Sequence, residues 1–586
     1  MNRRVWAWAC AGTMTAVMVG PGMASATGQQ ELQWSDCTEH LGYMDRGGLP
    51  EDVQWECADL EVPVDYENPD GRTTTVTVSR LPAANGAPRG TVFGNPGGPG
   101  VTALDFWLPS TLGENADMPA ELHREYDLVA VEPRGLTHGG AIECEGTVAD
   151  SLDPGRAYRA CAEADPEFVA SLSTANTARD LDTARQAMGV EQTDYLGYSY
   201  GTYLGGTYAT LYPDSTGKMV LDSAVNPDWV WQEEAAQQAE ASKARTNDMF
   251  QWIADNDDTY HLGTTPLQVF HNWERIVNDE PGGGLNLTPP DAQRDDLPEF
   301  LHPVDEPVLG AINGTAEARA RGMGAVRALT GQNNGRATSG VRDATLWALG
   351  DRDMWPVIAI RMQDINTYGA HQGDFVYYED TRPLTTNEVM FTAVTCNENG
   401  GVGDPVQAGL AEFNDLTGGN AFDVQAQRAR GGADCAGWPA TTEPVQIDGS
   451  GLEHQPLLLQ SERDPVTPFP GGPALAEALG GHLITVEGGD HGTFGRGNET
   501  VDGAVLDYLA TGQVPEIDRA PEAEPAPFAP AGDSDEAVVG DEGEYTGETF
   551  DLAARVDYAL RTETDPLTAT QELVDDAAEE LREALG

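Results

Sequence analysis

Short apolar runs bounded by turn residues predict buried strands in two separate parts of the chain. The run Asp194–Leu196 is followed by a segment of helical spacing that ends at Pro213. The apolar residues on one face of this segment are Tyr203, Leu204, Tyr208 and Leu211. Strands that alternate with helices in this way are typical of α/β folds. The predicted strands are Thr91–Gly94, Asp194–Leu196, Lys218–Asp222, Gln455–Gln460 and His482–Val486.

A long stretch of different pattern separates these two parts. Much of it has helical periodicity, and its tryptophans are expected mostly in a core. We therefore predict a large, mainly helical cap over residues 226–449, inserted between core segments 27–225 and 450–515. The helices predicted most clearly are Glu233–Ile253, Thr315–Leu329 and Gly340–Asp364.

The turn after the second strand contains the pattern Gly197-x-Ser199-x-Gly201. In a nucleophile elbow the serine occupies a strained strand-to-helix turn, and glycines flank it because a Cβ there would clash with neighbouring backbone. The string alone is a weak signal in a chain with 67 glycines. The strand before it and the helix after it favour the elbow, so Ser199 is the predicted nucleophile.

An acid and then a histidine follow the serine in the chain order of α/β-hydrolases. Asp464 lies in the turn-rich loop after one predicted strand, and His491 lies in the loop after the next. Each alone is an ordinary loop residue, but their joint order predicts His491 as general base and acid, with Asp464 orienting its imidazole. The fold predicted is an α/β-hydrolase, a mostly parallel central sheet with helices on both faces.

A glycine-rich turn, Asn95–Gly100, follows the first predicted strand and leaves backbone N–H groups uncovered. An oxyanion hole usually takes one N–H from such a loop and one from the residue after the nucleophile. We therefore predict the amides of Gly98 and Tyr200 as donors to the oxyanion; a simple sharp turn is the alternative.

Taken together, these motifs resemble the secreted tripeptidyl aminopeptidases of the proline-iminopeptidase family. The resemblance covers roughly residues 32–515. In this chain Pro96 stands where iminopeptidases usually have histidine, which argues against a strict proline iminopeptidase. Leu136-Thr137 replaces the small residues that usually follow Arg134-Gly135. The matching segments are Asn95–Gly100, Tyr126–Gly135, Thr177–Arg185, Gly197–Thr202, Thr395–Asn399, Asp464–Pro468 and Asp490–Gly492.

The resemblance implies a peptidase that acts on peptides with a free N-terminus. Such an enzyme needs an acidic partner for the substrate ammonium group. Glu398 is the predicted partner because of its family-like setting, and an ordinary structural carboxylate is the alternative.

The first residues have the pattern of a secretory signal peptide: a basic start, an apolar core from Val5 to Val19, and the cleavage signal Ala24-Ser25-Ala26. We predict cleavage near Ala26 and secretion. Cys10 lies in this leader. The other cysteines are even in number, which indicates disulfides in an exported chain, and nearest-neighbour pairing is the simplest of many pairings. The pairs would be Cys37–Cys57, Cys144–Cys161 and Cys396–Cys435.

The formal net charge of −63 is expected to repel nucleic acid and anionic membranes. Part of it lies in residues 516–586, predicted as an acidic linker, disordered in composition from Arg519 to Thr549, and a C-terminal helix. No C-x-x-C or paired-histidine spacing occurs, so we expect no metal and no cofactor. A monomer is expected.

The residues thus predict a secreted serine exopeptidase that removes tripeptides or similar short units. Two alternatives remain. A carboxylesterase would use the same triad and oxyanion hole, because the cap decides specificity. A binding protein without catalysis on a hydrolase scaffold is the second alternative, against which the intact triad order counts.

Overall fold

The computed structural model describes residues 30–522, with gaps at 42–53, 109–117, 148–149, 151–152, 280–284, 299, 301, 303–305, 331–336, 370–374, 378–383, 385 and 400–402. The predicted signal peptide and the chain beyond residue 522 lie outside these residues.

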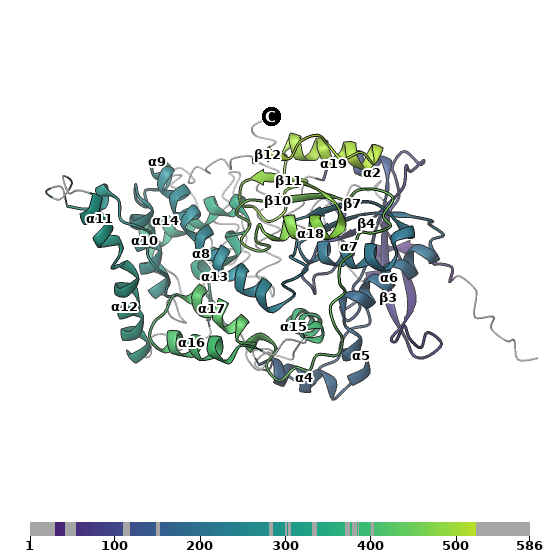
Figure 1. Cartoon of the computed structure of the whole chain (residues 1–586), viewed down its shortest axis with the longest axis horizontal. Helices are drawn as coiled ribbons and strands as arrows, with labels where there is room; N and C mark the ends of the chain where they lie inside the picture. The colour runs from purple at the N-terminus through teal and green to yellow at the C-terminus, as the bar shows by residue number, and fades with distance from the viewer. Residues whose placement is uncertain are drawn as a thin grey trace, which may run out of the picture.

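Ten strands of the described chain form one central sheet (Figure 1). The first three strands pair antiparallel, as do β3 and β5, and the remaining pairs are parallel. The sheet is therefore mostly parallel, as predicted. In sheet order the strands are β1 (Ser35–Asp36), β2 (Glu56–Pro63), β3 (Thr73–Leu81), β5 (Asp127–Val131), β4 (Thr91–Asn95), β6 (Thr193–Tyr198), β7 (Thr216–Asp222), β10 (Leu457–Ser461), β11 (His482–Glu487) and β12 (Arg519–Pro521).

Hydrophobic cores cover both faces of this sheet. Successive side chains of a strand point to opposite faces, so Val129 and Val131 of β5 join one core while Leu128 and Ala130 join the other. Strands buried on both faces have continuous apolar runs, which is why β4, β6, β7, β10 and β11 were predicted from the sequence. The first core packs against α4 (Pro154–Ala162), α5 (Pro166–Ser171), α6 (Thr174–Ala187), α7 (Tyr200–Leu211) and α18 (Gly471–Leu479); the second packs against α2 (Ala120–Glu125) and α19 (Glu499–Thr511).

The described elements between β7 and β10 are helices apart from one small two-stranded antiparallel sheet, β8 (Ala337–Ser339) with β9 (Phe375–Tyr377). Most of these helices gather beside the sheet, on the left in Figure 1, and have a hydrophobic core of their own. In chain order, the α-helices between β7 and β10 are α8 (Gln232–Asp255), α9 (Asp257–Tyr260), α10 (Pro266–Asp279), α11 (Glu306–Asn313), α12 (Ala316–Thr330), α13 (Gly340–Ala348), α14 (Trp355–Tyr368), α15 (Thr386–Glu398), α16 (Pro405–Leu416) and α17 (Ala421–Arg430). Of these, α15 packs on the first core of the sheet.

The structure differs from the expected elements in two places. The single helix predicted over Gly340–Asp364 is two helices, because the chain turns after α13 and Asp351 caps the short 3-10 helix Arg352–Met354 by accepting a hydrogen bond from Asp353 N. The tail predicted from residue 516 begins too early: β12 pairs with β11 at the edge of the sheet. Backbone pairing keeps this short segment in the sheet, although its composition is typical of a linker.

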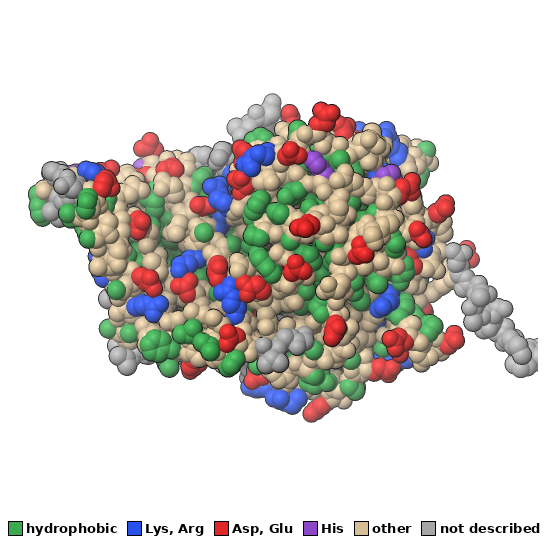
Figure 2. Space-filling view, in the orientation of Figure 1, with side chains coloured by type: hydrophobic (Ala, Val, Ile, Leu, Met, Phe, Trp, Pro, Cys, Tyr) green, Lys and Arg blue, Asp and Glu red, His purple; other side chains and the backbone are tan. Residues whose placement is uncertain are grey.

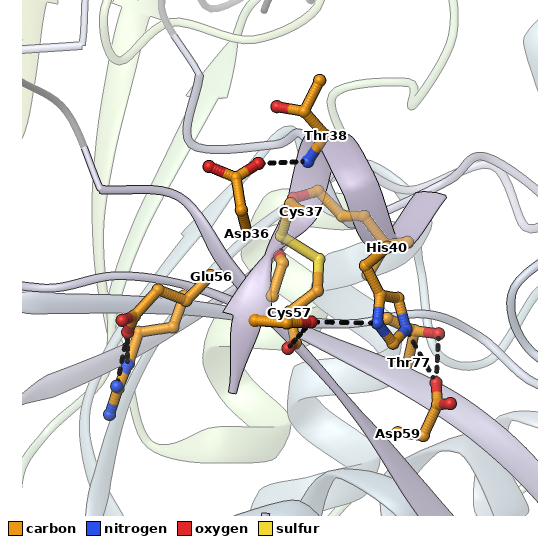
Figure 3. Close-up of a disulfide and its surroundings, with 12 residues drawn as sticks. Asp36, Cys37, Thr38, His40, Glu56, Cys57, Asp59 and Thr77 are labelled. Carbon is orange, nitrogen blue, oxygen red and sulfur yellow. Dashed lines mark hydrogen bonds and ion pairs between the residues drawn. A yellow bond between two sulfur atoms is a disulfide. The ribbon is translucent and has the colours of Figure 1, made fainter. Parts of the chain in front are cut away.

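Three disulfides join the nearest-neighbour pairs of the sequence analysis: Cys37–Cys57, Cys144–Cys161 and Cys396–Cys435. Figure 3 shows the first of them, which ties α1 (Cys37–Leu41) to β2. Beside it, His40 Nε2 lies 3.0 Å from Asp59 Oδ1, to which Thr77 Oγ1 also donates at 3.2 Å. Covalent links of this kind are typical of proteins in oxidising compartments.

Figure 2 shows Asp and Glu side chains over both the core and the cap on the visible face, in keeping with the strongly negative net charge. Within the described residues, no helix has the length and the run of apolar side chains that crossing a membrane requires.

Candidate active site

Ser199 lies at the turn between β6 and α7, with φ of 56° and ψ of −126°. A positive φ is strained for serine and is the backbone feature of a nucleophile elbow. The flanking glycines are required by space: a Cβ on Gly197 would lie 2.5 Å from Gly201 O, and one on Gly201 would lie 2.6 Å from Asn95 O. Ser199 is partly exposed, so a substrate can reach it.

Asp464 and His491 meet at the carboxyl ends of β10 and β11. His491 Nδ1 lies 3.0 Å from Asp464 Oδ2 and 3.2 Å from Oδ1, and both side chains are buried. The N–H groups of Val466 and Thr467 donate to Asp464 Oδ1 at 2.8 and 3.0 Å. Because these amides hold the carboxylate in place, its second oxygen faces the imidazole and can fix the proton on Nδ1.

Thr467 adds a contact that the sequence did not indicate. Its hydroxyl donates to Asp464 Oδ2 at 2.9 Å and lies 3.2 Å from His491 Nδ1. Gln460 also reaches this carboxylate, since its Nε2 lies 3.4 Å from Asp464 Oδ2 and donates to Thr467 O at 2.9 Å. The acid and its loop are therefore held from both sides.

Asp222, at the end of β7, joins the serine turn to the histidine loop. Its backbone oxygen accepts the Ser199 N–H at 3.0 Å, and its carboxylate accepts the N–H groups of Thr493 and Phe494, both at 2.8 Å. Burial raises the pKa of Asp222 to about 6, although these hydrogen bonds oppose the shift. This carboxylate accepts hydrogen bonds from backbone N–H groups and from the hydroxyls of Thr493 and Ser223, whereas the carboxylate that contacts the imidazole is that of Asp464.

The loop Asn95–Gly100 lies against the serine turn. A Cβ on Gly97 would lie 2.8 Å from Ser199 Cβ, so this position admits only glycine. Asn95 Oδ1 accepts the Gly97 N–H at 3.0 Å and stiffens the loop. Within the described chain the N–H groups of Gly98 and Tyr200 donate to no protein acceptor, which leaves both amides for a ligand oxygen.

The cap contacts the histidine loop directly. His491 N donates to Gly350 O at 2.7 Å. The preceding residue, Asp490, accepts from Arg352 Nε at 2.9 Å and from Arg245 Nη2 at 3.3 Å, and all three side chains are buried. Burial acts to raise the pKa of Asp490, but Arg496 together with Arg352 and Arg245 holds it below its usual value. Since Arg245 and Arg352 belong to the cap, the cap helps to position His491.

We expect Asp490→Asn to lower the free energy of unfolding by about 1.5 to 3 kcal/mol, because two buried guanidinium groups lose the carboxylate they share while each keeps one other, Asp248 or Glu522. The turnover number should fall at least about tenfold, since a small displacement of His491 misplaces the proton acceptor. Urea unfolding and ester hydrolysis measure the two effects. Glu462→Gln is the control: its partner Arg519 is exposed, and the expected loss is below about 1 kcal/mol. Wild-type stability and turnover in Asp490→Asn would contradict a positioning role for the cap.

Glu398 lies at the end of α15 and is 2% exposed. Its Oε1 accepts from Thr174 N at 2.6 Å, and its Oε2 accepts from Thr174 Oγ1 at 3.1 Å and Trp231 Nε1 at 3.0 Å. Thr174 is the first residue of α6, so the carboxylate caps that helix. Burial raises the pKa of Glu398 to about 7, and the three hydrogen bonds oppose the shift. The fold thus already supplies donors to both oxygens, and the predicted role toward a substrate ammonium stays a prediction.

No group of His, Cys, Asp and Glu residues in the described part of the chain has an arrangement that could hold a metal ion.

Comparison with known proteins agrees with this geometry. Models of the "alpha/beta hydrolase fold" and of a "TAP-like protein" match residues 91–295 and 420–521. The chain is 30% identical over 542 residues to tripeptidyl aminopeptidase of Streptomyces lividans, covering 86% of this chain and 89% of the relative. It is 27% identical over 561 residues to serine protease Hip1 of Mycobacterium tuberculosis strain H37Rv, covering 88% and 96%. Carboxylesterase B of the same strain is 27% identical over 540 residues, covering 84% and 90%.

The sheet order, the elbow and the 30% identity along most of both chains lead to one conclusion. The protein belongs to the tripeptidyl aminopeptidase-like family of α/β-hydrolases and is a serine hydrolase.

Proposed function

We propose that the protein is a secreted exopeptidase that removes tripeptides or similar short units from the free N-terminus of peptides, with Ser199, His491 and Asp464 as its catalytic triad. The observation that carries the proposal is the buried Asp464–His491 pair in the loops next to an elbow serine. Secretion is supported by the signal-peptide pattern and the disulfides.

In this mechanism Ser199 Oγ attacks the carbonyl carbon of the scissile bond while His491 Nε2 takes the hydroxyl proton. Asp464 keeps the proton on Nδ1 and stabilises the imidazolium that forms. The amides of Gly98 and Tyr200 donate to the oxyanion of the tetrahedral intermediate. His491 then protonates the leaving amine, which leaves as the shortened peptide. A water molecule, deprotonated by His491, hydrolyses the acyl-enzyme and releases the short N-terminal unit.

The main rival function is that of a carboxylesterase, because one relative carries that name and the same triad cleaves esters. Peptide specificity is favoured by the higher identity to the relative named tripeptidyl aminopeptidase. A binding protein without catalysis is the remaining alternative, and labelling with a fluorophosphonate tests it because only an activated serine reacts.

A substrate panel separates peptidase from esterase. It consists of a tripeptide p-nitroanilide with a free N-terminus, the same compound with an acetylated N-terminus, and a p-nitrophenyl ester of a short fatty acid. We expect kcat/KM for the free tripeptide to exceed that of the acetylated one at least about tenfold, because a charged terminus bound by a carboxylate contributes about 1.5 kcal/mol or more. Equal rates on the two peptides would contradict the aminopeptidase proposal, and hydrolysis of the ester alone would make the protein an esterase.

A further inference from the structure

Glu234, in the first turn of α8, has a buried carboxylate to which no described side chain donates a hydrogen bond. The residue is 7% exposed, and among the described residues neither Oε1 nor Oε2 has a hydrogen-bond partner. Burying an ionised carboxylate without a partner is strongly unfavourable. Native proteins seldom keep such a group unless a ligand or a catalytic role requires it.

The same face of α8 lies against the loop that carries the catalytic acid. One turn after Glu234, Gln238 Nε2 donates to Val466 O at 2.9 Å, and one turn later Ser242 Oγ lies 3.5 Å from Pro465 O. Residues four apart lie on one side of a helix. The Glu234 side chain is therefore on the side of α8 that faces the Asp464 loop.

Its electrostatic environment agrees with this placement. Burial raises the pKa of Glu234 to about 8 and Asp464 raises it further, whereas the nearby backbone N–H of Asn226 and the charge of His491 lower it. The neighbouring carboxylate behaves differently: Glu233 accepts two hydrogen bonds from Arg430, at 2.7 and 2.9 Å, and this ion pair lowers its pKa. Glu234 is thus the acidic group of this turn that is directed toward the triad and lacks a cation.

We propose that Glu234 binds the α-ammonium group of the peptide substrate and so determines the preference for a free N-terminus. The proposal rests on the proposed peptidase function and names the residue that gives it specificity. A primary ammonium group carries three N–H donors and a positive charge, which is what a buried carboxylate without partners lacks. In this proposal the substrate extends from Ser199 toward the start of α8, where the charges of Asp464 and His491 already act on the Glu234 carboxylate.

Glu398 is the competing residue for this role. Thr174 donates to both of its oxygens and Trp231 to one of them, whereas at Glu234 no described side chain donates and only the Asn226 N–H lies nearby. An ammonium group at Glu398 would have to share or displace donors that cap α6. At Glu234 the ammonium group would donate to carboxylate oxygens that have no described side-chain donor.

The experiment compares Glu234→Gln, Glu398→Gln and the control Glu233→Gln, using the free tripeptide p-nitroanilide and the short ester. In Glu234→Gln we expect the ratio of kcat/KM for free peptide to that for ester to fall at least about tenfold. The melting temperature should be unchanged or raised, because glutamine fills the same space without a carboxyl group whose charged form burial disfavours. In Glu398→Gln the melting temperature should fall, since charged hydrogen bonds to the helix end are lost. Glu233→Gln should leave the ratio at the wild-type value.

An unchanged ratio in Glu234→Gln would overturn the inference, as would a proportional loss on peptide and ester, which would indicate a role toward the triad or the fold. A selective loss in Glu398→Gln alone would move the ammonium site to that residue. These outcomes are distinct from failure of the proposed function, which wild-type enzyme reveals by hydrolysing free and acetylated tripeptides equally fast.

Discussion

Ser199→Ala is expected to lower kcat by about 10⁶-fold on peptide and ester substrates alike, because the variant has no nucleophile for the first step. Alanine fits the same turn without new contacts, so the protein should remain folded. Steady-state hydrolysis by the purified variant, with circular dichroism to check the fold, measures the effect.

Fluorophosphonate labelling should disappear in the same variant. Ser215→Ala is the matched control, since Ser215 lies in a turn after α7 and outside the site, and it should keep both labelling and activity. Substantial hydrolysis by Ser199→Ala, free of contaminating enzyme, would show that another residue is the nucleophile.

Asp464→Asn is expected to lower kcat by about three to four orders of magnitude while the fold is retained. The structure supplies the reason. The N–H groups of Val466 and Thr467 donate to Oδ1, so the asparagine oxygen must occupy that position and its NH₂ group must face His491. The amide then donates to Nδ1, which places the imidazole proton on Nε2, where the nucleophile needs an acceptor.

The measurement is the rate of ester hydrolysis over a range of pH, with the melting temperature as a check on folding. Asp222→Asn is a useful comparison, because Asp222 holds the backbone of the histidine loop and does not contact the imidazole. A turnover number of Asp464→Asn within tenfold of wild type, together with a far larger loss in Asp222→Asn, would make Asp222 the catalytic acid.

Features that depend on neighbours in the chain could be predicted from the sequence by itself. The glycines at 197 and 201 relieve clashes within one turn, so the pattern predicted the elbow and its serine. Strands buried on both faces must be apolar along their length, so β4, β6, β7, β10 and β11 were recognisable. The chain order of acid and histidine then predicted the pair that the structure joins by a hydrogen bond.

Features that depend on contacts between distant segments were decided only by the tertiary structure. Arg245, Arg352 and Asp490 are ordinary charged residues in sequence, and only packing of the cap on the core buries them together. The sequence of β12 has no strand pattern. This segment is a strand only because its backbone pairs with β11. The sequence alone does not distinguish the environments of Glu398 and Glu234. They differ because Thr174 of α6 and Trp231 donate to the Glu398 carboxylate, while the fold buries the Glu234 carboxylate without a described side-chain donor.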